Sequence, residues 1–178
     1  MYDMKALYQA KSVADAVALR LAHPEAQIIA GGSDVLVQMR EGKRAGKALI
    51  SIQGCREMRG VSLDEEENLR IGSLTTFSHI TADPLIQLYI NVLGEAVDMV
   101  GGPRSATPEP SAATPATASP PPTPPPPSTP GRPSWRSPAK NGVRRVPIKD
   151  FYLKAGAVDL RAEEGEIQTA ILIPKGVL

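Results

Sequence analysis

The sequence has little of several features that define whole classes of protein. Its 178 residues contain a single cysteine, Cys55, so an internal disulfide and a Cys-x-x-Cys metal or redox pair are both excluded. The net charge is only +1 and the basic residues are scattered, so the chain carries no electrostatic footprint for nucleic acid. No run approaches the roughly 18 apolar residues of a membrane span, and the opening MYDMKALYQAKS lacks the apolar region of a signal peptide. We therefore expect a cytoplasmic protein that binds neither nucleic acid nor membranes.

Proline is scarce outside one segment and abundant within it. Residues 104–139 hold 13 of the 18 prolines and contain no Val, Ile, Leu, Met, Phe or Tyr. Proline lacks a backbone N–H, and a chain rich in it samples polyproline II without internal hydrogen bonds. We therefore expect residues 104–139 to be an irregular, disordered segment that takes no part in a core. Its PPPTPPPP run contains PxxP, which is also typical of a linker or of a ligand for an SH3- or WW-like domain.

The sequence on either side of this segment has the apolar patterns of folded helices and strands. Ser12 and Asp15 predict the start of a helix, and His23-Pro24 predicts its end. Further helices are predicted over residues 35–40, 76–80 and 84–100. Strands are predicted over residues 27–30, 48–52, 69–72, 143–148 and 166–173. Helices and strands mix without regular βαβ repetition, which favours the α+β class.

The most informative motif is a predicted strand, a Gly-Gly-Ser-Asp turn and a predicted helix. Gly31 and Gly32 would let the backbone approach an anion closely, and the helix N-terminus would supply a positive end for phosphate. Ser33 adds a hydroxyl donor, and Asp34 is placed to cap the helix. The same four residues also suit any tight strand-to-helix turn. The spacing is neither GxGxxG nor GxxxxGK[ST], which disfavours a Rossmann or P-loop interpretation.

Four stretches of the sequence closely resemble the FAD-binding subunits of bacterial xanthine dehydrogenases, the flavin subunits of the molybdenum hydroxylase family. They are IIAGGSDVLVQMREGK, ISIQGCREMRGVSLDEEENLRIGSLTTFSHI, LGEAVDMVGGP and VRRVPIKDFYLKAG. The resemblance covers residues 1–103 and 140–175, the N-terminal part of such subunits. It implies an FAD-binding domain of the vanillyl-alcohol-oxidase type, with one small α/β subdomain over about residues 1–55 and a second over about residues 56–175.

The resemblance also implies which residues hold the cofactor. The FAD pyrophosphate would lie in the glycine turn and the strand before it, and the backbone of a later strand would pass near the flavin ring. The residues implied are Gln27, Ile28, Ile29, Ala30, Gly31, Gly32, Ser33, Asp34, Ile167 and Gln168. Electrons would arrive from a molybdopterin-binding subunit through the 2Fe-2S clusters of an iron–sulfur subunit, and would leave as hydride to NAD+. The cofactor supplies this chemistry, so no catalytic side chain and no metal ligand is assigned to the chain.

The proline-rich segment replaces a second glycine-rich signature of the family, QIRN-x-x-T-x-GGN-x-CN-x-x-x-SAD, which forms the other half of the FAD site. Codons can be chosen for residues 104–129 that, read from the third base, give IRNAGTIGGNTCNGVTSADTASTLH. We interpret the segment as this signature translated in a shifted frame, with a compensating shift near Lys140. Because proline cannot supply the N–H groups of a phosphate site, we expect FAD binding and activity to be impaired.

Two function classes therefore stay open. The first is an FAD-binding electron-transfer subunit, which resembles only the N-terminal part of its family because a C-terminal domain of roughly a hundred residues is expected to be absent. The second is a non-enzymatic interaction protein, an α/β scaffold that displays a polyproline loop to an SH3- or WW-like partner. The basic pair Arg144 and Arg145 is typical of a solvated strand edge or of a site where another subunit docks.

Overall fold

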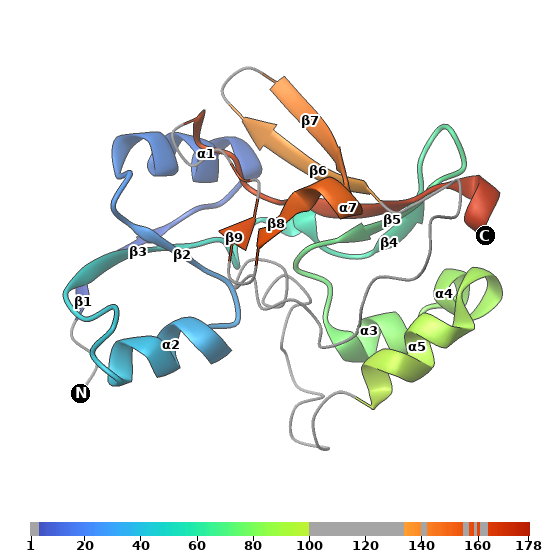
Figure 1. Ribbon diagram of the computed structural model, residues 1–178, viewed down its shortest axis with the longest axis horizontal. Coiled ribbons are helices and arrows are strands. Elements are labelled where there is room, and N and C mark those ends of the chain that lie inside the picture. The colour runs from blue at the N-terminus through green and yellow to red at the C-terminus, as the bar shows by residue number, and fades with distance from the viewer. Residues whose placement is uncertain (1–3, 100–133, 140–141, 155–156, 159, 161–163) are drawn as a thin grey trace.

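The computed structural model describes residues 4–99, 134–139, 142–154, 157–158, 160 and 164–178 of the chain. In this part of the chain two larger sheets lie side by side, and helices pack against each of them (Figure 1). Strands β8 (Tyr152–Lys154) and β9 (Ala157–Val158) form a small third sheet. The first of the larger sheets is parallel and the second antiparallel, so the predicted α+β class is confirmed. None of the described helices is long and apolar enough to cross a membrane.

The first sheet consists of three parallel strands. Their order is β1 (Met4–Gln9), β3 (Lys47–Ser51) and β2 (Gln27–Ile29). Helices α1 (Val13–Ala22) and α2 (Ser33–Arg40) connect the strands and lie on opposite faces of the sheet (Figure 1). The first part of the chain is thus a regular β-α-β-α-β unit. Strand β1 was not predicted because it alternates only between exposed and half-buried residues and carries no apolar stripe.

Helix α1 begins and ends where local signals in the sequence predict. The Ser12 hydroxyl accepts a hydrogen bond from the Asp15 N–H at 3.1 Å, and the Asp15 carboxylate accepts one from the Lys11 N–H at 2.9 Å. This reciprocal arrangement satisfies two N–H groups at the start of the helix. The C-cap is His23, directly before Pro24, and its ring stacks on Tyr8 of β1 with the ring centres 4.1 Å apart.

In the described part of the chain the second sheet has five antiparallel strands, two from residues 61–72 and three from residues 134–173. Its order is β4 (Val61–Leu63), β5 (Leu69–Gly72), β10 (Ala170–Ile173), β6 (Ser134–Ala139) and β7 (Gly142–Pro147). Strand β10 therefore lies in the middle, with Ile171 opposite Ile71 on one side and opposite Trp135 on the other. Of the predicted strand over residues 166–173, only the second half is a strand.

Three short helices cover one face of the second sheet: α3 (Phe77–Ala82), α4 (Pro84–Tyr89) and α5 (Asn91–Asp98) (Figure 1). They pack on the sheet through the buried side chains of Leu69, Ile71, Ile80, Ile86 and Ile173. The prediction of one helix over residues 84–100 is wrong, because the chain leaves helical geometry at Ile90, with φ −144° and ψ 62°. The bend lets Ile90 and Leu93 both pack against the same cluster, so tertiary packing outweighs the helical pattern.

The end of the proline-rich segment is folded. Residues 134–139 were expected to be irregular, but they form β6 and pair with β7 along their whole length, from Ser134 opposite Pro147 to Ala139 opposite Gly142. That expectation is wrong for these residues, while residues 104–133 lie outside the described part of the chain. The remaining described elements are η1 (Arg56–Met58), α7 (Ile148–Phe151), β8 (Tyr152–Lys154), β9 (Ala157–Val158) and η3 (Lys175–Val177).

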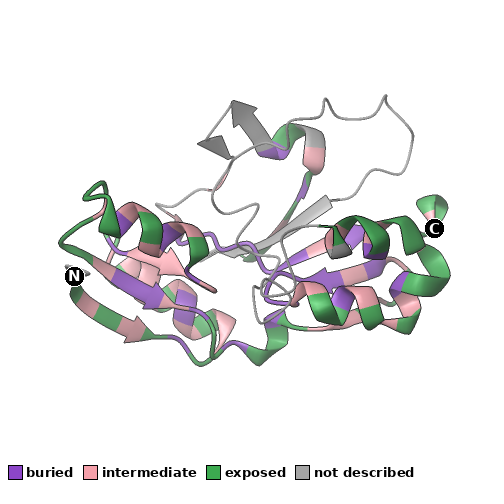
Figure 2. Ribbon diagram, turned by 90° about the horizontal axis from the view of Figure 1, so that it is seen from below, coloured by how far each residue is buried: buried purple, intermediate pink, exposed green. Residues whose placement is uncertain are grey.

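The core of the first sheet is completed by residues from the rest of the chain. Buried residues run through the interior of both halves of the molecule (Figure 2). The cluster beneath α1 consists of Ala10, Ala16, Ile52, Cys55, Met58, Leu74 and Ile167. Leu74 follows β5, and Ile167 lies just before β10, so the two sheets are joined through a shared apolar cluster. The segment that contains Ile167 is therefore fixed by packing.

Candidate cofactor site at the β2–α2 turn

The turn between β2 and α2 has a backbone conformation that requires glycine at one position. Gly32 has φ +88°, in the left-handed region. A Cβ built on Gly32 would lie 3.0 Å from Leu36 Cδ1 and 3.2 Å from Ile29 Cδ1. A side chain at this position would therefore be strained by the backbone and crowded by its neighbours.

The N-terminus of α2 lacks the usual side-chain cap. Gly32 occupies the N-cap position, and among the described residues no side-chain capping hydrogen bond is made there. The expected capping role of Asp34 is not realised, because its Oδ2 accepts a hydrogen bond from Gln38 Nε2 at 2.6 Å instead. The N-terminal end of α2 lies on the side of the first sheet that faces the second (Figure 1). Uncapped N–H groups with the positive end of the helix dipole suit an anionic group.

A chain of polar side chains braces this turn. Arg44 donates from Nε to Gln38 Oε1 and from Nη1 to Gln27 Oε1. Through Gln38 the same chain reaches Asp34, so it links the start of β2 to the first turn of α2. Gln53 adds a further tie, because its Nε2 donates to the carbonyl oxygen of Ala30 at 2.9 Å. Sequence reasoning missed Arg44, Gln38 and Gln53, since none belongs to the glycine motif.

The segment that leads into β10 is buried and held on two sides. Arg144 Nε and Nη2 donate to the two carboxylate oxygens of Glu166, at 2.6 and 2.7 Å, and Glu166 is 3% exposed. On the other side, Ser73 Oγ donates to the Gln168 carbonyl oxygen and Ser73 N–H donates to the Thr169 carbonyl oxygen, both at 2.9 Å. The bidentate ion pair between Arg144 and Glu166 is a strong, directional contact, so it holds this segment firmly.

The expectation of a solvated strand edge holds for Arg145, which is 52% exposed on the outermost strand of the sheet, but not for Arg144. Arg144 lies against the buried Glu166, and Arg145 donates to Glu66 Oε2 at 3.3 Å. Both partners are distant in the sequence, which is why the local pattern could not reveal them.

The predicted site residues thus fall in two places. Gln27, Ile28 and Ile29 form β2, Ala30, Gly31 and Gly32 form the turn, and Ser33 and Asp34 begin α2. Ile167 lies in the cluster beneath α1, and Gln168 is buried beside it. Neither amide atom of the Gln168 side chain has a hydrogen-bond partner in the described structure. The N-terminus of α2, where Gly32 offers no capping side chain, suits an anionic group. The buried Gln168 amide, which has no partner among the described residues, suits a polar one.

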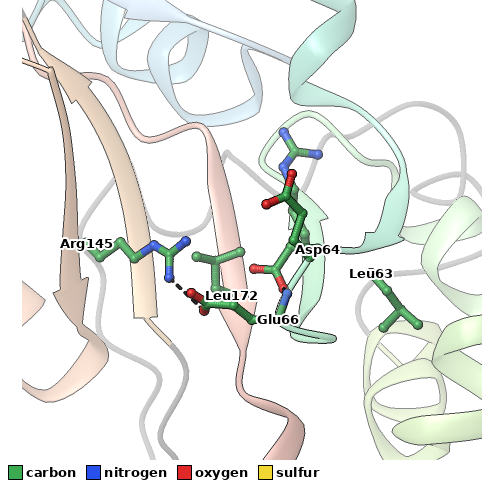
Figure 3. Close-up of a pocket in the computed structure, with 7 residues that line it drawn as sticks. Leu63, Asp64, Glu66, Arg145 and Leu172 are labelled. Atoms are coloured by element: carbon green, nitrogen blue, oxygen red, sulfur yellow. Dashed lines mark hydrogen bonds and ion pairs between the residues drawn. The ribbon is translucent and has the colours of Figure 1, made fainter.

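A separate hollow of about 410 Å³ lies on the second sheet (Figure 3). It is lined by Leu63, Asp64, Glu65, Glu66, Arg70, Arg145 and Leu172. Figure 3 shows Arg145 reaching across it to Glu66. No group of three or more His, Cys, Asp or Glu side chains suited to a metal ion occurs among the described residues.

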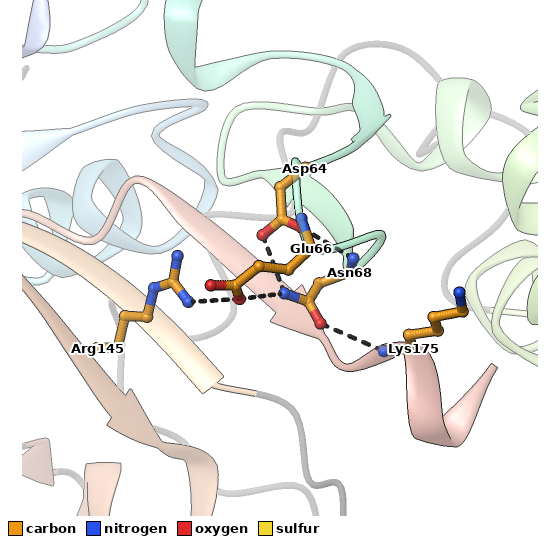
Figure 4. Close-up of polar contacts among 5 residues, drawn as sticks. All are labelled: Asp64, Glu66, Asn68, Arg145 and Lys175. Atoms are coloured by element: carbon orange, nitrogen blue, oxygen red, sulfur yellow. Dashed lines mark hydrogen bonds and ion pairs between the residues drawn. The ribbon is translucent and has the colours of Figure 1, made fainter.

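The acidic turn beside this hollow is bonded internally (Figure 4). Asp64 Oδ1 accepts from the N–H groups of Glu66 and Asn68, at 3.0 and 2.9 Å. Asn68 Nδ2 donates to Asp64 Oδ2 at 3.0 Å, and Asn68 Oδ1 accepts from the Lys175 N–H at 3.3 Å. Partial burial acts to raise the pKa of Asp64, but the hydrogen bonds from Asn68 and Glu66, with the Arg145 charge, lower it below its usual value. The turn thus ties the β4–β5 hairpin to β7 and η3, and we assign it a structural role.

Cys55 is an inert core residue. Its side chain is fully buried, and its Sγ lies 3.8 Å from the Ala10 carbonyl oxygen. Burial, with smaller contributions from the Glu57 and Asp15 carboxylates, raises the pKa of the thiol to about 11. A thiol with this pKa is not a nucleophile near neutral pH.

Comparison with known proteins identifies the family to which this fold belongs. Residues 2–105 match the family described as the FAD binding domain in molybdopterin dehydrogenase. The chain belongs to that family.

Its relatives are longer than this chain. The chain is 33% identical to the xanthine dehydrogenase FAD-binding subunit of Escherichia coli O157:H7, over 98% of this chain and 59% of that protein. It is 28% identical to the carbon monoxide dehydrogenase medium chain of Hydrogenophaga pseudoflava, over 92% of this chain and 56% of that one. The chain thus spans somewhat under three fifths of the length of these relatives.

Solved structures share the fold. Carbon monoxide dehydrogenase from Hydrogenophaga pseudoflava superimposes with a TM-score of 0.85 at 25% identity, covering 98% of this chain and 60% of that one. Quinoline 2-oxidoreductase from Pseudomonas putida 86 gives a TM-score of 0.83 at 19% identity with the same coverage, and this likeness concerns the fold alone. The expected resemblance to the flavin subunits, as the N-terminal part of a longer chain, is confirmed.

Proposed function

We propose that this chain is the FAD-binding, electron-transfer part of a xanthine dehydrogenase. The observation that carries the proposal is the left-handed Gly32 turn with its uncapped helix, inside the stretch that matches an FAD-binding family. Residues Gln27 to Asp34 hold the pyrophosphate, with backbone N–H groups and the α2 dipole facing its charge. Ile167 and Gln168 lie near the flavin ring. The boundary between the two subdomains lies near residue 55, between the end of β3 and the start of β4.

FAD, when bound, supplies the two-electron and one-electron chemistry of the reaction. The residues of this chain bind and orient it, and none acts as a catalytic acid or base. Electrons come from a molybdopterin-binding subunit through the 2Fe-2S clusters of an iron–sulfur subunit, and NAD+ accepts them. The names of the relatives, an FAD-binding subunit and a medium chain, support an assembly of several subunits. We place this assembly in the cytoplasm.

The activity of this particular chain is impaired in our proposal, because residues 104–139 replace the second FAD-binding signature. A shifted coding frame accounts for the replacement without a change in spacing. Strand β6 supports a shifted frame beyond residue 129. It is paired with strands on both sides, yet it is built from Ser-Trp-Arg-Ser-Pro-Ala.

The genetic code limits what the shifted frame encodes at β6. Trp135 has the single codon TGG, so the shifted codon that begins in codon 134 ends in TG and encodes only Leu, Met or Val. With TCN codons for Ser134 and Ser137, the shifted codons that begin in 133 and 136 end in TC and encode Phe, Leu, Ile or Val. With a CGN codon for Arg136, the shifted codon that begins in codon 135 is GCG, which encodes alanine. A run of four apolar residues suits a strand that lies between two others in a sheet.

The experiment compares this chain with a matched chain in which residues 104–139 are replaced by the shifted-frame residues. Each is purified and its flavin content is read from the absorbance band at about 450 nm, a property of the cofactor. The restored chain is expected to carry close to one FAD per chain, and the original chain much less. A restored chain without flavin would contradict the proposed function. Coding DNA that does not give TIGGN-x-CN when read one base along would contradict the frame shift alone.

The interaction-protein alternative rests on the PxxP sequence of residues 120–127. It predicts that an SH3 or WW domain binds the original chain and not the restored chain, without any flavin present. Titration of both chains with such a domain distinguishes the two functions.

A further inference from the structure

The hydrogen bonds behind the β2–α2 turn run in a fixed direction. Arg44, in the loop after α2, can only donate, and it donates to Gln38 Oε1 and to Gln27 Oε1. Because Arg44 takes the acceptor oxygen of the Gln38 amide, the donor Nε2 of that amide faces Asp34 and donates to its Oδ2 at 2.6 Å. An ionised carboxylate only accepts hydrogen bonds, so each group in the run meets a complementary partner. The orientation of the Gln38 amide is therefore set by its neighbours.

These bonds decide where the Asp34 carboxylate lies. Asp34 is in the first turn of α2, where a carboxylate is attracted to the N–H groups and to the positive end of the helix dipole. The Leu36 N–H bonds to the Gly32 carbonyl oxygen at 2.9 Å, as expected for the first bond of the helix, so the N–H groups of residues 33–35 lie before it. The contact with Gln38, four residues later, instead draws the carboxylate along the helix, away from that end.

The position of this carboxylate matters because two anions compete for the same N–H groups. A carboxylate that caps α2 would use donors that an anionic ligand needs, and its negative charge would repel the ligand. Displacing it would cost the ligand part of its binding energy. A helix that keeps its only first-turn carboxylate away from these N–H groups avoids this cost.

We propose, on the basis of the FAD function above, that Gln38 is a positioning residue for the pyrophosphate. It holds the Asp34 carboxylate away from the N-terminus of α2, and Arg44 orients the Gln38 amide for this contact. Gln38 acts through Asp34 and makes no contact of its own with the cofactor. When Gln38 releases it, the Asp34 carboxylate caps α2 and competes with the pyrophosphate.

The test replaces Gln38 with methionine, which keeps the length of the side chain and removes its amide. The matched control is Gln87→Met, since Gln87 is exposed on α4 and donates to the Thr81 carbonyl oxygen at 3.2 Å. Hydrogen exchange of the N–H groups of residues 33–35, measured on the original chain without FAD, should slow by about fivefold in Gln38→Met, the effect of one helix cap. The dissociation constant for FAD, measured by flavin fluorescence on the restored chain, should rise by about the same factor. Gln87→Met should change neither.

A second substitution separates this competition from a merely structural role of Gln38. In Gln38→Met combined with Asp34→Ala no carboxylate is left to compete, so most of the lost FAD affinity should return. Affinity that does not return shows that Gln38 only supports the fold of the turn, which overturns the inference. Unchanged hydrogen exchange or unchanged FAD affinity in Gln38→Met also overturns it and leaves the proposed function intact. Failure of the restored chain itself to bind FAD contradicts the proposed function, and this inference with it.

Discussion

The left-handed turn at Gly32 allows a prediction with a closely matched control. Gly32 and Gly60 have nearly the same left-handed φ, +88° and +86°. A Cβ on Gly32 would meet Leu36 at 3.0 Å and Ile29 at 3.2 Å, whereas a Cβ on Gly60 would meet nothing within 4 Å. The substitutions Gly32→Ala and Gly60→Ala therefore share the backbone strain and differ in crowding.

The magnitudes follow from these two contributions. A left-handed conformation costs a residue with a side chain about 1–2 kcal/mol relative to glycine, and the lower chain entropy of unfolded alanine returns about 0.4–1 kcal/mol. Gly60→Ala should therefore lower the free energy of unfolding by about 1 kcal/mol. Crowding in a packed site adds about another 1 kcal/mol or more to Gly32→Ala. With a urea m-value of about 2 kcal/mol/M, the Gly32 variant should unfold at about 0.5 M less urea than the Gly60 variant.

Urea denaturation followed by circular dichroism measures the stability difference, and FAD titration of the folded variants measures the second consequence. Gly32→Ala should weaken FAD binding, because relief of the contacts with Leu36 and Ile29 displaces the turn that we propose to hold the pyrophosphate, while Gly60→Ala should leave the affinity unchanged. Equal urea midpoints for the two variants would refute the crowding argument. Unchanged FAD affinity in Gly32→Ala would refute the placement of the pyrophosphate at this turn.

Three further predictions concern groups away from the turn. Arg144→Met should cost about 3–5 kcal/mol of unfolding free energy, because it removes the bidentate cationic partner of the buried Glu166 carboxylate. Arg144→Met combined with Glu166→Leu should recover most of this loss in the same urea assay, and a single variant within about 1 kcal/mol of wild type would show that the pair is unimportant. The lowered pKa of Asp64 means that its stabilising contribution is complete above its unfolded pKa of about 3.9 and is lost as the pH falls through the lower folded value. Asp64→Asn should therefore flatten the acid side of a plot of urea midpoint against pH, and an unchanged slope would contradict this. Cys55, with its pKa raised to about 11, should react with a thiol reagent at pH 7 only as fast as the core opens, so rapid labelling of the native chain would contradict its burial.

Local signals in the sequence predicted the elements that local forces determine. The signals that begin and end helix α1, Ser12 and Pro24, lie within a few residues of its two ends. The glycine turn was recognised from four consecutive residues. The break at Ile90 and the strand β6 were not predictable in this way. The first follows from packing of α4 and α5 on the second sheet, and the second from pairing with β10 and β7.

The polar framework of the candidate site was also beyond local reasoning. Arg44 reaches back to Gln27, Arg144 pairs with Glu166, and Ser73 bonds to Gln168. These contacts join residues that are far apart in the sequence, so no motif of fixed spacing marks them. The assignment of Gln168 to the site came from family resemblance, and its unpaired amide is visible only in the fold.

The central place of β10 in the second sheet has a consequence for how the protein folds during synthesis. Strands β4 and β5 leave the ribosome early, but β5 pairs on its open edge with β10, which is made about a hundred residues later. All three strands of the first sheet have been synthesised by residue 51, but the apolar cluster beneath α1 is incomplete until Ile167 has been added. Closing so long a loop costs little more entropy than closing a loop of half its length. The length of chain between β5 and β10 therefore has only a small effect on the free energy of pairing them. Until then β5 has an unpaired edge, and a nascent chain held at this stage would be most exposed to aggregation.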